Sequence, residues 1–172
     1  MTKEDIKEVI ELKQQEMPFD VKARFEVLPI SGGQIVTLPG VRRCGKSTRM
    51  ELAINDLLKA GVPRENILWI GFDDERFAQC SVSELDMILD AYREMFPTIP
   101  LKDVWMFFDE LPLVEGWELF ALRVFKSYCK NMFICCSNAH TLSKEMKSEL
   151  RGWPVEFETF PLSFAEYCDF SG

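Results

Sequence analysis

The stretch IVTLPGVRRCGKST, from Ile35 to Thr48, decides the fold. Its first four residues form a short apolar run rich in β-branched side chains, which is typical of a buried parallel strand. The eight residues from Gly40 to Ser47 match the pattern G-x-x-x-x-G-K-[ST], and a helical pattern follows from about 47 to 60. A strand, a glycine-containing loop and a helix in this order predict a phosphate-binding loop.

The backbone and side chains of this loop suit a nucleoside triphosphate, and Mg-ATP is the expected ligand. Glycines let backbone N–H groups turn inward at the start of a helix, where they bind anions. Lys46 is expected to contact the β- and γ-phosphates, and the hydroxyl of Ser47 to bind Mg²⁺. The predicted nucleotide-binding residues are Gly40, Val41, Arg42, Arg43, Cys44, Gly45, Lys46, Ser47 and Thr48.

Some of these loop residues have two interpretations. Arg42 and Arg43 either add positive potential near the phosphates or project into solvent. Cys44 is either an oxidation-sensitive point or simply a small residue that fits the loop.

The apolar run from Val104 to Phe108 ends in the acidic pair Asp109-Glu110. In a fold with a phosphate-binding loop, the carboxyl end of such a strand lies beside the phosphates. Asp109 is therefore expected to bind Mg²⁺, directly or through water, and Glu110 to orient and deprotonate the attacking water. The pair favours hydrolysis over phosphate transfer to a small molecule.

Strands and helices alternate along the chain. Strands are predicted at 23–30, 35–38, 67–70, 104–108, 132–136 and 155–160, and helices at 6–12, 47–60, 83–96, 118–128 and 142–150, with Ser163 and Glu166 as the capping box of a last helix. This order predicts an α/β three-layer sandwich with a mainly parallel sheet. Residues 1–30 are expected to pack as a helix and a strand on a single domain formed by 31–172.

Composition and charge exclude several classes of function. The net charge of −8 and the pI near 4.8, without a long basic run, disfavour nucleic-acid binding. Six cysteines without a C-x-x-C pair, and a single histidine, disfavour a structural zinc site. The charged N-terminus is no signal peptide, and no apolar run approaches the roughly 20 residues of a membrane helix. A reduced, cytoplasmic protein is expected.

Several stretches, in order, resemble the AAA-type ATP-binding proteins of bacteria and archaea, in which an N-terminal ATPase domain precedes a C-terminal domain of uncertain role. They are GVRRCGKST, ILWIGFDDERF, FFDE followed by VEGWE, SNAHTLSKE, LRGW and FPLSFAEYCDF. The resemblance runs from Met1 to Gly172, and FDDERF and PLSF-x-EY are its more specific markers.

The resemblance implies a core of five strands in an AAA-type order, in which the strand before Ser137 lies between the strands before Gly40 and Asp109. It assigns Asn138 a sensor role. From the residues alone, a polar side chain at Ser137 or Asn138 is expected to contact the γ-phosphate or the water, and a helix cap in a turn is the alternative. If the chain assembles as AAA proteins do, Arg151 is the candidate to reach a neighbouring site; otherwise it bonds the last carbonyls of a helix. The resemblance also places the stretch Asp73-Asp74-Glu75-Arg76 near the nucleotide edge of the sheet, and a solvated turn with local ion pairs is the alternative interpretation of these residues.

Three departures from the family pattern bear on activity. Pro112 stands where Gln is expected, Trp153 stands where Arg is expected, and the chain ends before the family's second domain. Losing an arginine that stabilises the transition state costs roughly 10³–10⁵ in rate. The leading hypothesis is therefore Mg-ATP binding with slow hydrolysis. The alternative is a nucleotide-dependent switch with negligible hydrolysis, whose output lies with a partner or the missing domain. A homo-oligomer or a protein partner is compatible with either hypothesis. A kinase is weaker, because no arginine-rich lid is evident.

Overall fold

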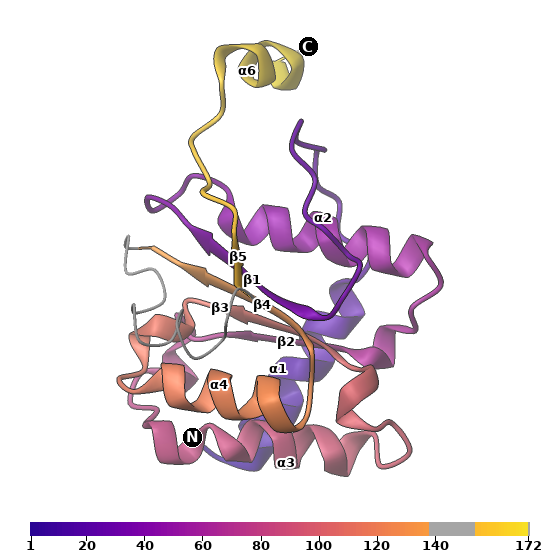
Figure 1. Ribbon diagram of the computed structural model, residues 1–172, viewed down its shortest axis with the longest axis vertical. Coiled ribbons are helices and arrows are strands. Elements are labelled where there is room, and N and C mark those ends of the chain that lie inside the picture. The colour runs from indigo at the N-terminus through magenta and orange to yellow at the C-terminus, as the bar shows by residue number, and fades with distance from the viewer. Residues whose placement is uncertain (138–153, 172) are drawn as a thin grey trace.

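A single parallel sheet forms the centre of the molecule in the computed structural model, which describes residues 1–137 and 154–171 (Figure 1). Its strands lie in the order β2-β3-β4-β1-β5 and are all parallel. They are β1 (Gln34–Pro39), β2 (Ile67–Gly71), β3 (Trp105–Asp109), β4 (Asn131–Cys136) and β5 (Pro154–Glu156). The predicted order is confirmed, since β4 lies between β1 and β3 and brings the carboxyl ends of these three strands together.

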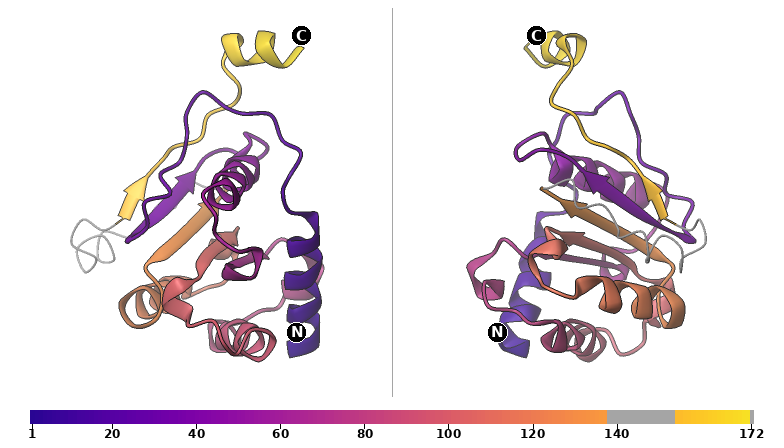
Figure 2. Two further views of the ribbon diagram at one scale, coloured as in Figure 1. Left: turned by 90° about the vertical axis from the view of Figure 1, so that its right-hand side faces the viewer. Right: turned by 60° about the vertical axis from the view of Figure 1, so that its left-hand side comes forward.

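Helices cover both faces of the sheet and complete the predicted three layers (Figures 1 and 2). The helices are α1 (Lys3–Glu16), α2 (Lys46–Lys59), α3 (Asp86–Met95), α4 (Trp117–Ser127) and α6 (Phe164–Ser171). Short 3-10 helices span Arg64–Asn66, Glu75–Phe77, Val82–Glu84, Leu101–Asp103 and Leu111–Leu113.

Each face of the sheet buries its own apolar cluster. Phe108 belongs to the cluster under α1, α3 and α4, whereas its neighbour Phe107 belongs to the cluster under α2. Successive strand residues point to opposite faces, so a strand covered on both sides must be apolar at every position. This is why the central strands read as continuous apolar runs in the sequence.

The prediction of a strand at 23–30 is wrong, because these residues form neither helix nor strand. The side chains of Phe25 and Val27 are each 67% exposed, whereas Leu28 is buried. A strand requires a partner, and β1 already pairs with β4 on one side and β5 on the other. The connection from α1 to β1 therefore crosses the α2 side of the molecule as an irregular segment (Figure 2).

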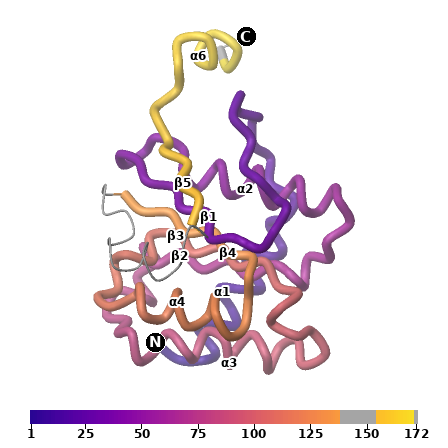
Figure 3. Tube along the Cα trace, in the orientation of Figure 1, coloured from indigo at the N-terminus to yellow at the C-terminus, as the bar shows by residue number. Residues whose placement is uncertain are grey.

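The C-terminal part leaves the sheet and ends in α6 (Figure 3). The strand predicted at 155–160 is assigned only over Pro154–Glu156. Its pairing with β1 nevertheless continues, since Phe157 N donates to Thr37 O at 2.8 Å and Thr159 N donates to Pro39 O at 2.8 Å. The predicted capping box is confirmed: Ser163 N donates to the Glu166 carboxylate, and Glu166 N donates to Ser163 Oγ.

The predicted helix at 142–150 lies outside the described residues. Within the part of the chain that is described, no helix is both long enough and apolar enough to cross a membrane.

Candidate functional site

In the loop between β1 and α2, the two glycines of the motif occupy positions that favour glycine. Gly45 adopts a left-handed φ of 94° and caps α2, and Arg43 also has a positive φ of 65°. A Cβ atom at Gly40 would lie 2.4 Å from the carbonyl oxygen of Thr159 and 2.8 Å from Sγ of Cys44. Glycine is therefore required at position 40 by close approach, and is strongly favoured at position 45 by backbone geometry.

Lys46, at the first position of α2, turns its ammonium group back over this loop. Its side chain is only 5% exposed. Nζ donates to the carbonyl oxygens of Gly40 (3.2 Å) and Val41 (3.0 Å), and lies 3.9 Å from Oε1 of Glu110. A largely desolvated positive charge thus lies between the loop and the end of β3, where it can neutralise phosphate oxygens.

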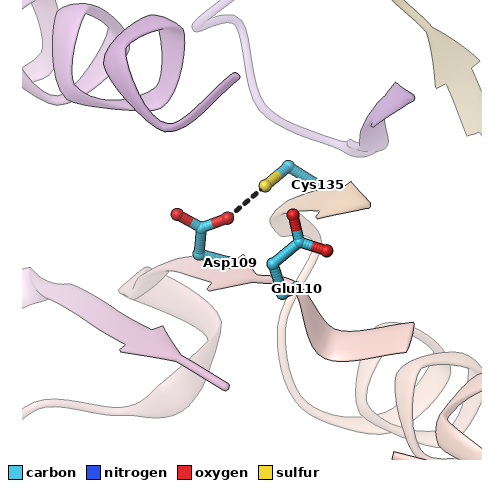
Figure 4. Close-up of side chains that lie close together, drawn as sticks. All are labelled: Asp109, Glu110 and Cys135. Atoms are coloured by element: carbon cyan, nitrogen blue, oxygen red, sulfur yellow. Dashed lines mark hydrogen bonds between the residues drawn. The ribbon is translucent and has the colours of Figure 1, made fainter. Parts of the chain in front are cut away.

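Asp109, the last residue of β3, lies beside the start of α2. It accepts hydrogen bonds from the side chains of Ser47 and Cys135, and the contact with Cys135 is drawn in Figure 4. Burial raises the pKa of Asp109, whereas the bonds from Cys135 and Ser47 lower it. The hydroxyl of Ser47 and the carboxylate of Asp109 are the hard oxygen ligands that suit Mg²⁺, so the predicted pair is brought together.

The carboxylate of Glu110 is held by Ser137, the first residue after β4. Ser137 N donates to Oε2 at 2.8 Å, and the Ser137 hydroxyl donates to Oε1. Glu110 itself has a left-handed φ of 55°. Such a backbone conformation is costly for a non-glycine residue and is maintained by its surroundings. Ser137 therefore contacts the proposed base, whereas the sequence pointed to a phosphate or water contact.

These groups line one cleft of about 830 Å³. A volume of roughly 300–1,000 Å³ is usual for a small-molecule site. The lining residues are Val41, Arg42, Arg43, Gly45, Lys46, Ser47, Thr48, Asp73, Asp109, Glu110, Leu113 and Ser137.

The positions of several residues relative to the cleft bear on interpretations that the sequence left open. Arg42 and Arg43 are exposed and line it, so their charges lie near any ligand there. Cys44 is buried beneath the loop and does not line the cleft, which favours its interpretation as a small residue that fits. Asn138 and Arg151 lie outside the described residues, and their roles stay predictions.

Two contacts behind the loop were missed by sequence reasoning. Arg24 donates to the carbonyl oxygen of Cys44 at 3.0 Å, and Arg49, in the first turns of α2, donates to Oγ1 of Thr159 at 3.1 Å. Arg24 lies in the segment mistaken for a strand, and no local pattern marks it. The PLSF-x-EY stretch was noted, but nothing in the sequence indicates what it contacts.

Comparisons with known proteins agree with this arrangement. The family model described as an AAA domain matches residues 32–168. An uncharacterized protein of Haemophilus influenzae is 36% identical over 135 residues, which are 77% of this chain and 32% of that protein. An uncharacterized protein of Methanocaldococcus jannaschii is 34% identical over 137 residues, or 80% of this chain and 29% of that protein. The chain thus spans about a third of the length of these curated relatives.

Two solved structures show a more distant likeness. That of C. elegans PCH-2 has a TM-score of 0.48 and 13% identity, covering 94% of this chain and 42% of that one. That of AMPPCP-bound DnaA from Aquifex aeolicus has a TM-score of 0.48 and 18% identity, covering 93% and 46%.

Proposed function

The chain belongs to the AAA domain family and is a nucleotide-binding domain of that type, and we propose that it binds ATP with Mg²⁺ and hydrolyses it slowly. The observation that carries this proposal is the convergence of four side chains on one cleft. Lys46, Ser47, Asp109 and Glu110 come from two separate sequence motifs, and all of them line it. A cation, two oxygen ligands and a carboxylate base are the groups that phosphoryl transfer to water requires.

Each group has a distinct task in this proposal. The N–H groups of the loop receive phosphate oxygens, and Lys46 exchanges its bonds to the Gly40 and Val41 carbonyls for bonds to phosphate. Ser47 and Asp109 would hold Mg²⁺, whose chemistry is to neutralise charge on the phosphates. Arg42 and Arg43 add positive potential at the open side of the cleft.

Glu110 is the proposed general base, and its contacts explain why turnover is expected to be slow. Both of its carboxylate oxygens accept hydrogen bonds from Ser137. Each oxygen keeps a second lone pair that can accept a proton, but the two bonds fix the direction of the carboxylate, and turning it toward an attacking water elsewhere in the cleft would break them. The same observation supports the second candidate function, in which ATP binding is the signal and hydrolysis is negligible.

A phosphate-release assay with a Glu110→Gln variant tests the enzyme hypothesis against the switch hypothesis. General base catalysis contributes about 10²–10⁴-fold to a rate. We therefore expect release to fall by about that factor while ATP affinity stays close to the parent's. Glu115→Gln, at an exposed position that does not line the cleft, is the matched control. A parent that binds Mg-ATP but releases phosphate no faster than Glu110→Gln would favour the switch instead.

A further inference from the structure

Arg24 links three separate parts of the chain from behind the phosphate-binding loop. Its Nη1 donates to the carbonyl oxygens of Cys44 (3.0 Å) and Phe160 (3.2 Å). Its Nε and Nη2 donate to the two carboxylate oxygens of Glu166 at 3.0 and 3.1 Å. The side chains of Arg24 and Glu166 are only 10% and 8% exposed. A planar guanidinium with both of its donor edges occupied is held in one orientation.

Glu166 has a second task in α6. Its Oε2 accepts hydrogen bonds from the backbone N–H of Ser163 (2.9 Å) and from the Ser163 hydroxyl (3.0 Å), so the same carboxylate closes the capping box of α6. The glutamate of the PLSF-x-EY stretch therefore joins the start of the last helix to Arg24. Through Arg24 it is joined to the phosphate-binding loop.

The contact with Cys44 fixes the direction of a peptide group that matters for phosphate binding. A trans peptide is planar, and its carbonyl oxygen and amide hydrogen point in opposite directions. Because the Cys44 oxygen points at Arg24, the N–H of Gly45 points away from Arg24. A Cβ at Gly45 would lie 3.4 Å from Nη1 of Arg24, which places the guanidinium directly against this peptide. Gly45 also lines the cleft.

We propose that Arg24 and Glu166 are positioning residues of the nucleotide site, which hold the Cys44–Gly45 peptide with its N–H directed toward bound phosphate and couple this loop to α6. The guanidinium also withdraws electron density from that peptide, which makes its N–H a stronger donor. The coupling to phosphate binding rests on the proposed function. The orientation of the loop does not, since it follows from the contact of Arg24 with the Cys44 carbonyl.

A neighbouring set of contacts braces the loop from the same side. Arg49 donates to Glu26 at 2.8 Å and to Oγ1 of Thr159 at 3.1 Å, and the carbonyl of Thr159 lies against Gly40. The segment before β1, which holds Arg24 and Glu26, and the segment after β5, which holds Thr159, are therefore both connected to the loop. Arg24 and Arg49 make these connections.

The test uses Arg24→Gln and Glu166→Gln in the full chain, with two measurements. Calorimetric titration gives the affinity for Mg-ATP, and hydrogen exchange of peptides covering residues 40–48, without nucleotide, gives the order of the loop. Losing one hydrogen bond to a charged group corresponds to about a tenfold loss of affinity. We expect about tenfold weaker Mg-ATP binding and faster exchange of the loop in both variants.

Two further variants separate positioning from general destabilisation. Ser163→Ala weakens the cap of α6 but leaves the Arg24–Glu166 pair intact. Arg93→Gln removes an arginine of the exposed ion pair with Asp90 on α3. Both variants are expected to bind Mg-ATP with the affinity of the parent and to show the parent's hydrogen exchange in residues 40–48. A small change in melting temperature does not alter this expectation.

Three outcomes would overturn the proposal. One is unchanged affinity and unchanged loop exchange in Arg24→Gln and Glu166→Gln. Another is an equal loss of affinity in Ser163→Ala, because the effect would then belong to the folding of α6. The third is a parent that binds no Mg-ATP, which removes the proposed function. In that case the exchange measurement still decides whether Arg24 and Glu166 order the loop.

Discussion

At the scale of single residues, the candidate site carries charge that is costly to bury. Asp109 is 7% exposed, and burial raises the pKa of its carboxyl group. A raised pKa of an acid means that its ionised form is disfavoured by folding, so the stability that this group contributes falls as the pH rises through its titration range. Asp109 thus lowers stability at neutral pH in the absence of a cation.

Replacing Asp109 with Asn should therefore separate stability from ligand binding. We expect the Asp109→Asn variant to melt at the same temperature as the parent or higher when no ligand is present. Its affinity for ATP should no longer rise when Mg²⁺ is added, because an oxygen ligand with negative charge is gone. Thermal melts and titrations with and without chelator measure both effects. A variant that keeps its Mg²⁺ dependence would contradict the role given to Asp109.

The geometry of the site could be predicted only in part. Lys46 and Asp109 were predicted because each role demands a particular residue type at a particular place in a motif. The contact of Asp109 with Cys135 was not predicted, since it depends on how β3 and β4 pair. Their register sets Phe108 beside Ile134, and the next residues along the two strands are Asp109 and Cys135. A single sequence does not contain that register.

At the scale of elements, β3 connects the core to the site. The ring of Phe107 stacks on Phe133 with centroids 4.6 Å apart and on Trp69 at 6.1 Å. Its side chain is fully buried, so truncation would leave a cavity among rings that cannot close around it. Asp109 lies two residues after Phe107 on the same strand. The packing of Phe107 therefore helps to hold Asp109 in place at the site.

A Phe107→Ala variant is expected to lose about 3–5 kcal/mol of unfolding free energy, the usual cost of deleting a buried ring. Urea unfolding followed by circular dichroism measures it. Leu119→Ala, on the exposed face of α4, is the control and should change stability by no more than about 0.5 kcal/mol. Similar losses of unfolding free energy in the two variants would contradict the view that the buried packing of Phe107 stabilises the fold.

The elements themselves were largely predictable from local patterns. The strands β1 to β4 and the helices α2 to α4 lie within a few residues of their predicted ranges, because buried strands and amphipathic helices leave distinct apolar periods. The segment 23–30 has a similar alternation around Phe25 and Val27, yet it forms no strand. Whether a strand finds a partner is decided by the whole sheet, and β5, far away in sequence, occupies the place beside β1.

At the scale of the whole molecule, the ion pair of Arg24 and Glu166 connects the segment before β1 and the helix α6 to the phosphate-binding loop. The hydrogen bonds from Arg24 hold the pKa of Glu166 at about 2, below its ordinary value of 4.5. A lowered pKa of an acid means that the pair stabilises the fold fully above about pH 4.5. This stabilisation is lost as the pH falls from there toward 2.

The parent and Glu166→Gln should therefore differ in stability in a pH-dependent way. Their difference in unfolding free energy is expected to be constant from about pH 6 to 8 and to shrink steadily below pH 4.5. Urea unfolding of both proteins across this pH range gives the difference directly. The control is Arg93→Gln, which removes the exposed ion pair with Asp90 instead. A difference that grows on acidification would contradict the ion pair between Arg24 and Glu166.

The central claim is that the loop around Lys46 binds Mg-ATP, and a calorimetric titration tests it most directly. The parent is compared with Lys46→Ala and with Lys59→Ala, which removes an exposed lysine at the far end of the same helix. Losing a buried charged partner weakens binding by about a hundredfold or more. The account predicts that loss in Lys46→Ala alone. A folded parent that does not bind Mg-ATP, or that binds it as tightly without Lys46, would contradict it.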